Sequence, residues 1–157
     1  MPEIAVRRAL EESVEEVLEK MFFIRPLGEA AAGPAPENEF AAQLAFAGDP
    51  PGWLSLRVTS RAARSIAADF LADEEEALTE QQVGEVICEL ANMICGSVLS
   101  RVESGITFRL AAPRIVPSSD PPAPGATVHA VDIGNGALTV TMCMGNPACQ
   151  MVPESAF

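Results

Sequence analysis

The tripeptide Gly134-Asn135-Gly136 separates two predicted strands, and in the second of them apolar and polar residues alternate. Asn-Gly between alternating runs is a strong signal for a tight β-hairpin, because the turn needs residues that tolerate positive φ. The two strands cover residues 127–133 and 138–144, and alternation sends successive side chains to opposite faces of a sheet. The sequence therefore predicts two adjacent antiparallel strands with one face turned to a core.

A second hairpin is predicted nearer the N-terminus. Residues 40–47 carry Leu44 and Phe46 on one face, residues 53–58 alternate between apolar and polar, and the turn residues Asp49-Pro50-Pro51-Gly52 lie between the two runs. A further alternating run at residues 106–110 predicts one more strand. The strands together indicate a sheet rich in antiparallel pairs.

Three amphipathic helices are predicted, over residues 3–22, 61–71 and 79–102, with Phe70 on the inward face of the second. Ser60 is placed to cap the second helix. The third and longest begins at a capping box, Thr79-x-x-Gln82. The predicted fold is α+β: an antiparallel-rich sheet packed with three helices, in one domain over residues 1–146 followed by a tail over residues 147–157.

The net charge and the hydropathy of the chain bear on which partners it could bind and where it is located. The chain has 157 residues and a net charge of −12, so nucleic acid and anionic membrane surfaces are unfavourable partners. No uninterrupted apolar stretch reaches the roughly 20 residues of a membrane helix. The N-terminus, Met-Pro-Glu followed by alternating charges, does not resemble a signal peptide. A cytoplasmic location without membrane insertion is expected.

The cysteines and the single histidine predict no metal centre. Cys88 and Cys95 lie seven residues apart on the third helix, about 10 Å along its axis, which is too far for a disulfide. Cys143 lies near the end of a strand, and none of the cysteine spacings matches a zinc motif. All four cysteines are interpreted as buried or half-buried thiols, and His129 as a surface or half-buried strand residue.

The third helix has an unusual polar face. Val83, Ile87, Leu90, Ile94 and Val98 form its core side, and the opposite side holds Gln81, Glu85, Glu89, Asn92, Gly96, Ser100 and Glu103. Asn is a mediocre helix former, and Gly costs about 1 kcal/mol relative to Ala inside a helix. A function that needs an amide and a close approach of another backbone would explain both residues. Helix packing at Gly96 would explain the glycine equally well, and a plain solvated face is the simplest interpretation of the stripe.

The segment Glu89-Leu90-Ala91-Asn92-Met93-Ile94-Cys95-Gly96 resembles the Glu-x-x-Asn-x-x-x-Gly helix of the CheX/CheC/FliY chemotaxis phosphatases. In that family an acidic or Ser residue lies four positions before the Glu, where this chain has Glu85. A Pro follows the Asn by about two dozen residues, and Pro113 and Pro117 both lie near that distance. The order of helices and strands over residues 5–145 is also similar. Because the opening helix contains no Asn, a single site is expected, as in the CheX pattern.

The resemblance implies a phosphatase for the phospho-aspartate of a CheY-like response regulator. Asn92 and Glu89 would be the catalytic residues, with Asn92 orienting a water and Glu89 docking the regulator's lysine. Glu85 and Gly96 would bind the partner. No cofactor of its own is implied, since the regulator would supply Mg²⁺, and a homodimer is compatible with the family. One alternative is a non-catalytic adaptor that binds a regulator or resembles a flagellar-switch domain. Another is a structural or assembly domain, for example a dimer formed through sheet edges, which is compatible with either role.

Overall fold

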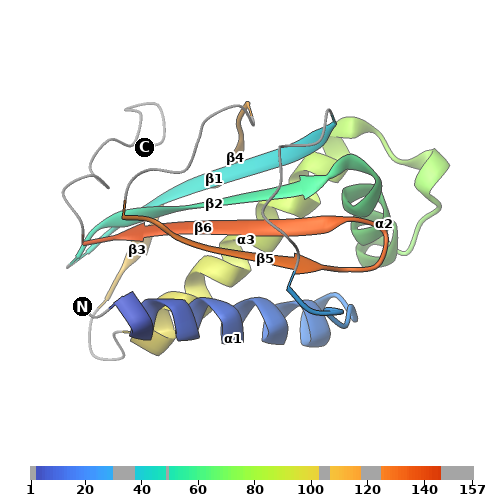
Figure 1. The fold of residues 1–157 in the computed structure, drawn as a ribbon. Helices are drawn as coiled ribbons and strands as arrows, with labels where there is room; N and C mark the ends of the chain where they lie inside the picture. The colour runs from blue at the N-terminus through green and yellow to red at the C-terminus, as the bar shows by residue number, and fades with distance from the viewer. Residues whose placement is uncertain (1–2, 30–37, 49, 103–106, 118–124, 146–157) are drawn as a thin grey trace.

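One antiparallel sheet organises the molecule, in the strand order β3-β1-β2-β6-β5 with β4 also paired to β1 (Figure 1). The computed structural model describes residues 3–29, 38–48, 50–102, 107–117 and 125–145. The strands are β1 (Glu39–Ala47), β2 (Gly52–Thr59), β3 (Arg109–Leu110), β4 (Arg114–Ile115), β5 (Thr127–Asp132) and β6 (Ala137–Met144). The helices are α1 (Glu3–Met21), α2 (Ser60–Leu71), the 3-10 turn η1 (Glu75–Ala77) and α3 (Glu80–Val102).

The two predicted hairpins form the centre of the sheet. In the β5–β6 turn, Ile133 N donates to Gly136 O (3.0 Å) and Gly134 has φ +99°, a backbone conformation that glycine adopts without steric cost. The hairpins join through β2 and β6, where Leu54 lies opposite Met142 and Leu56 opposite Val140. The apolar face is therefore continuous from β1 through β2 to β6, and on β5 it meets the polar residues Thr127 and His129, which lie opposite Met142 and Val140.

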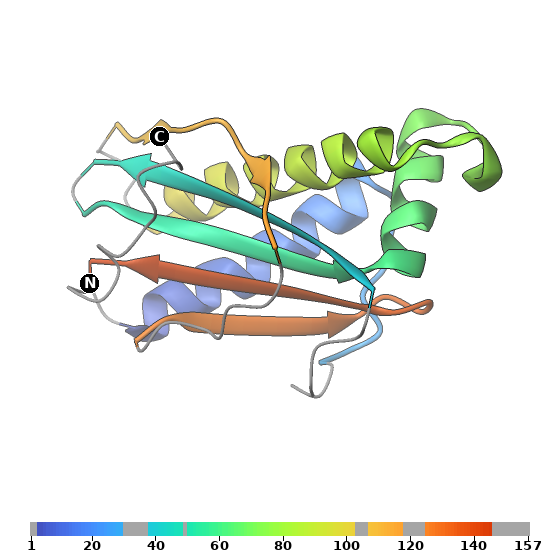
Figure 2. The same ribbon diagram turned by 90° about the horizontal axis from the view of Figure 1, so that it is seen from above.

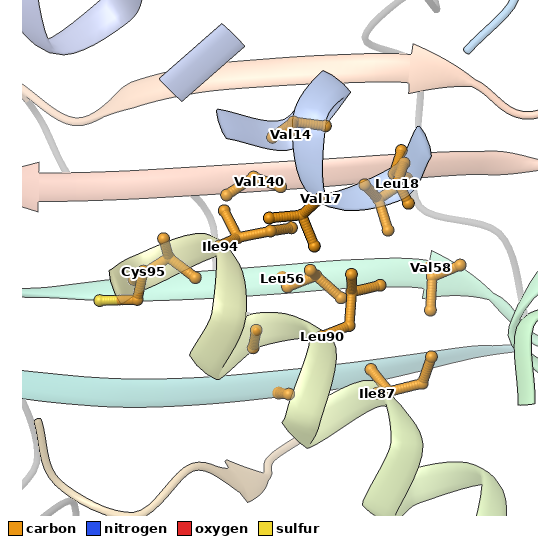
Figure 3. Close-up of a cluster of buried hydrophobic side chains, with 14 of the residues drawn as sticks. Val14, Val17, Leu18, Leu56, Val58, Ile87, Leu90, Ile94, Cys95 and Val140 are labelled. Carbon is orange, nitrogen blue, oxygen red and sulfur yellow. The ribbon is translucent and has the colours of Figure 1, made fainter. Parts of the chain in front are cut away.

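Helices α1 and α3 lie on one face of this sheet, and α2 packs against α3 at the end of the strands, as the view from above shows (Figure 2). Their apolar sides meet the sheet in one continuous core. Leu90 and Ile94 of α3, Leu18 of α1 and Leu56 of β2 are all fully buried there (Figure 3). The α+β fold and its three helices are confirmed.

The α3 helix begins as predicted. Thr79 N donates to Gln82 Oε1 (2.8 Å) and Gln82 N donates to Thr79 Oγ1 (3.1 Å), which completes the capping box.

By length and composition α3 alone among the described helices could cross a membrane. That differs from the expectation that no segment would qualify. Ten of its residues are buried inside the domain, so its apolar side is accounted for by the core.

Several local predictions were wrong. Ser60 is the first residue of α2 and not its cap. The cap position is Thr59, the last residue of β2, and it makes no side-chain capping bond. Phe70 is 40 % exposed, although its ring stacks on Phe22 with centroids 4.9 Å apart.

The chain after α3 also departs from expectation. The predicted strand at residues 106–110 is reduced to Arg109–Leu110, and Ile106 lies outside the described residues, as do Glu103 and the predicted tail 147–157. The short strand β4 was not predicted. Cys143 is disulfide-bonded and not a thiol, whereas Cys88 and Cys95 are free.

Candidate active site on the longest helix

The predicted site residues lie together on the side of α3 that faces away from its buried core. Glu85 and Glu89 are exposed, and Asn92 and Gly96 are half-buried. Each lies three or four residues from the next, so they form one row along the helix. A partner approaching this side of α3 would meet two carboxylates, one carboxamide and a stretch of bare backbone.

The two central side chains of this row are unengaged. Within the described residues, neither the Asn92 carboxamide nor the Glu89 carboxylate takes part in a hydrogen bond or an ion pair with another residue. Glu85 Oε1 accepts a bond from Gln81 Nε2 (3.3 Å). Asn92 and Glu89 therefore offer all their polar atoms to water or to a partner.

Gly96 is not explained by helix packing. A Cβ built on this residue would have no neighbouring atom within 4 Å. At Gly84, by contrast, a Cβ would lie 3.2 Å from Ile115 Cγ1. The packing glycine of α3 is Gly84, where β4 crosses the helix. The absence of a side chain at Gly96 leaves the helix backbone open from outside.

A groove of about 590 Å³ adjoins the row, between the first half of α3 and the strand β4. Its rim carries Glu80, Glu85 and Glu89, and its apolar surface includes Phe40, Pro113 and Ile115. Of the two prolines near the family spacing, Pro113 is the one in this groove, beside both carboxylates of the row. Sequence reasoning missed the groove because β4 was not predicted.

The thiol in the groove is a poor nucleophile. Burial raises the pKa of Cys88, and the nearby Glu85 carboxylate raises this pKa further. Thiolate is the reactive form of cysteine. The residues of the groove thus offer no activated nucleophile, and a carboxamide with carboxylates suits the orientation of water and the pairing of a cation instead.

Comparison with known proteins agrees with this fold. Residues 40–130 match the family described as chemotaxis phosphatase CheX, and this region contains the whole of α3 and Pro113. The chain belongs to the CheX family of chemotaxis phosphatases. No curated protein matches the chain in sequence.

Solved structures share the fold at low sequence identity. A CheX from Vibrio vulnificus has a TM-score of 0.72 at 19 % identity, over 89 % of this chain and 96 % of that one. A CheX from Desulfovibrio desulfuricans has a TM-score of 0.69 at 20 % identity, over 89 % of this chain and 99 % of that one. The structure of a CheX-CheY-BeF3-Mg²⁺ complex from Borrelia burgdorferi gives a TM-score of 0.71 at 16 % identity, over 88 % of this chain and 97 % of the matched one.

Proposed function

We propose that this protein is a phosphatase that stimulates hydrolysis of the phospho-aspartate of a CheY-like response regulator. The observation that carries the proposal is the pair of unengaged side chains, Glu89 and Asn92, on the outer face of α3 within the region that matches the CheX family. The CheX protein of Borrelia burgdorferi, which shares this fold, forms a complex with CheY.

Asn92 is the residue proposed to act on the reacting water. An acyl phosphate is already reactive, so the main requirement is a water held in line with the phosphorus. The Asn92 carbonyl would accept a hydrogen bond from this water, and its NH₂ group would donate to a phosphoryl oxygen. A 100-fold acceleration corresponds to about 2.7 kcal/mol, which is within the reach of positioning alone.

Glu89 and Glu85 are proposed to fix the regulator in place. A lysine of the regulator would pair with the Glu89 carboxylate, one helical turn from Asn92. The regulator would supply the Mg²⁺ ion, so that this chain needs no cofactor of its own. The bare backbone at Gly96 would let the regulator approach α3 closely, and the groove beside Glu85 would receive an apolar side chain of the same partner.

The test is the lifetime of a phosphorylated CheY-like regulator at matched Mg²⁺, with and without the protein. We expect a shorter lifetime, and a loss of about 100-fold or more in stimulation for Asn92→Ala. Glu89→Gln should weaken binding of the regulator as well. Glu76→Gln, which removes an exposed carboxylate on η1, is the control for charge. Full activity of Asn92→Ala would show that its assigned role is wrong, and binding without faster phosphate loss would establish the adaptor alternative.

Homodimerisation is a separate part of the proposal. On β5, the outermost long strand of the sheet, Asp132 exchanges backbone hydrogen bonds with Leu27 and Gly28, so this stretch of edge is already paired within the chain. A dimer formed through sheet edges would therefore use other parts of the sheet. Sedimentation over a wide concentration range tests it, and a monomer throughout would remove it without affecting the phosphatase.

A further inference from the structure

Three ligand-type side chains from distant parts of the sequence meet beside β5. Glu11 lies on α1, Glu29 on the segment that follows α1, and His129 on β5. One candidate ligand atom from each lies within 4.8 Å of the others. The same three residues line a cavity of about 320 Å³, together with Glu15. Local spacing could not indicate this cluster, because the residues lie 18 and 100 positions apart along the chain.

The backbone holds the three segments in place. Glu29 forms a β-bridge with Val131, and Asp132 N donates to Gly28 O (2.9 Å). Arg7, one turn before Glu11 on α1, donates to Val128 O (3.1 Å). Val131 belongs to the main core, and His129 lies two residues before it, so the imidazole is on the helix-covered side of the sheet. Figure 1 shows α1 running alongside β5 at this place.

No protein group among the described residues compensates the charges of the cluster. Within the part of the chain that the structure describes, the side chains of Glu11, Glu15, Glu29 and His129 form no hydrogen bond or ion pair with other residues. The neighbouring Arg7 guanidinium is bonded to a backbone carbonyl instead. Three carboxylates around one cavity favour a bound cation. The imidazole adds selectivity, because a nitrogen ligand suits first-row transition ions better than Ca²⁺ or Mg²⁺.

We infer that Glu11, Glu29 and His129 form a binding site for one divalent transition-metal ion, of the kind that Zn²⁺ represents. Zinc lies about 2.1 Å from nitrogen and carboxylate ligands, so two ligand atoms of one ion are separated by about 4 Å or less. The cluster must therefore contract slightly, and the exposed Glu29 side chain has the freedom to do so. A fourth position remains for water or for Glu15.

The ion would join α1, the segment after it and β5 at one point. This site is made from elements other than α3, and it is independent of the proposed phosphatase activity. Binding of the ion should therefore stabilise the folded state by mass action. This effect should not depend on Glu85, Glu89, Asn92 or Gly96 of α3.

The experiment is calorimetric titration of the metal-stripped protein with Zn²⁺, paired with thermal unfolding. We expect one ion per chain, and an unfolding midpoint raised by roughly 5–10 °C at a zinc concentration of about 100 times Kd. His129→Ala and Glu29→Gln should each weaken binding at least about 10-fold. The exposed position of Glu29 ensures that at least one of these variants folds normally. Glu76→Gln, distant in the fold on η1, is the matched charge control and should bind like the parent protein.

Cys88→Ser distinguishes this site from zinc binding by the free thiol. Zinc affinity that is unchanged in Cys88→Ser and reduced in both cluster variants supports the inference. Affinity that persists in His129→Ala and Glu29→Gln would overturn it, as would the absence of any 1:1 binding to the parent protein.

Discussion

The Nη2 atom of Arg101 lies 2.7 Å from Oε2 of Glu16, so the last turn of α3 is bonded directly to α1. The same guanidinium donates from Nε to the fully buried Ser13 hydroxyl (3.1 Å), which also accepts a bond from Ser97 (3.0 Å). One side of α3 is thereby fixed to α1. The row that carries Glu89 and Asn92 lies on another side and stays open.

Replacing Arg101 with Met should lower the free energy of unfolding by about 1–2 kcal/mol. The ion pair is partly exposed and contributes up to about 1 kcal/mol, and the bond to buried Ser13 contributes about as much again. Urea unfolding measures the change. Arg61→Met, at an exposed position of α2, is the control, and an equal effect of the two substitutions would contradict this account of the α1–α3 contact.

Gly96→Ala should separate stability from activity. Because a Cβ at this position meets no atom within 4 Å, the variant should gain about 1 kcal/mol of helix propensity. The added methyl group would occupy the surface proposed for the regulator, so the stimulated rate of dephosphorylation should fall. Urea unfolding and the phospho-regulator lifetime together measure both effects.

Gly84→Ala is the matched comparison for this variant. It gains the same propensity, but its Cβ lies 3.2 Å from Ile115 Cγ1 and forces that side chain to move. We expect a smaller gain in stability than at Gly96. Equal gains would mean that the contact between α3 and β4 is not close in solution, and an unchanged rate for Gly96→Ala would remove Gly96 from the docking surface.

The two free thiols of α3 should differ in reactivity. Burial raises the pKa of Cys95 to about 12, and burial together with Glu85 raises the pKa of the half-buried Cys88 less strongly. A higher pKa leaves less thiolate at a given pH, so alkylation of both should be slow at pH 8 and faster as the pH rises, with Cys95 always the slower.

Glu85→Gln isolates the electrostatic cause. Removing this charge lowers the pKa of Cys88, and the alkylation rate of Cys88 at pH 8 should increase while that of Cys95 stays unchanged. Mass spectrometry of labelled peptides measures each rate, with the unfolded protein as the reference in which both thiols react freely. A Cys95 that reacts as fast as Cys88 in the folded protein would show that α3 opens locally.

Patterns that depend on near neighbours in the sequence were predictable. The capping box at Thr79 and Gln82 and the Gly134–Gly136 turn each involve a few consecutive residues, and the structure has both. The common face of Glu85, Glu89 and Asn92 followed from helical periodicity. The roles of these residues came from family resemblance, because periodicity alone does not distinguish an active site from a solvated face.

Features that depend on tertiary contact were not predictable. The crossing of β4 over Gly84 creates the groove, and the two-residue strand β4 carries no alternating pattern that sequence could reveal. The same limit applies to Glu11, Glu29 and His129, which only the pairing of the segment after α1 with β5 brings together. Ser60 was misassigned because β2 runs into α2 without a loop, which the residue types do not indicate.

Ile115 has an exposed side chain (48 %) that forms part of the apolar surface of the groove beside Glu85 and Glu89. Ile115→Lys should lower the free energy of unfolding by about 1 kcal/mol, since the side chain is half exposed and its covered part packs beside Gly84 of α3. The lysine would place a positive charge where we propose that a basic, partly apolar surface of the regulator docks. Affinity for the regulator should therefore fall about 10-fold or more, while the rate at saturating protein changes little because Asn92 is intact.

Leu71→Lys is the control for this variant, because it introduces a lysine at another exposed apolar residue (42 %), on α2 and away from the groove. Equal losses of affinity in the two variants would show that net charge, and not the groove, governs docking.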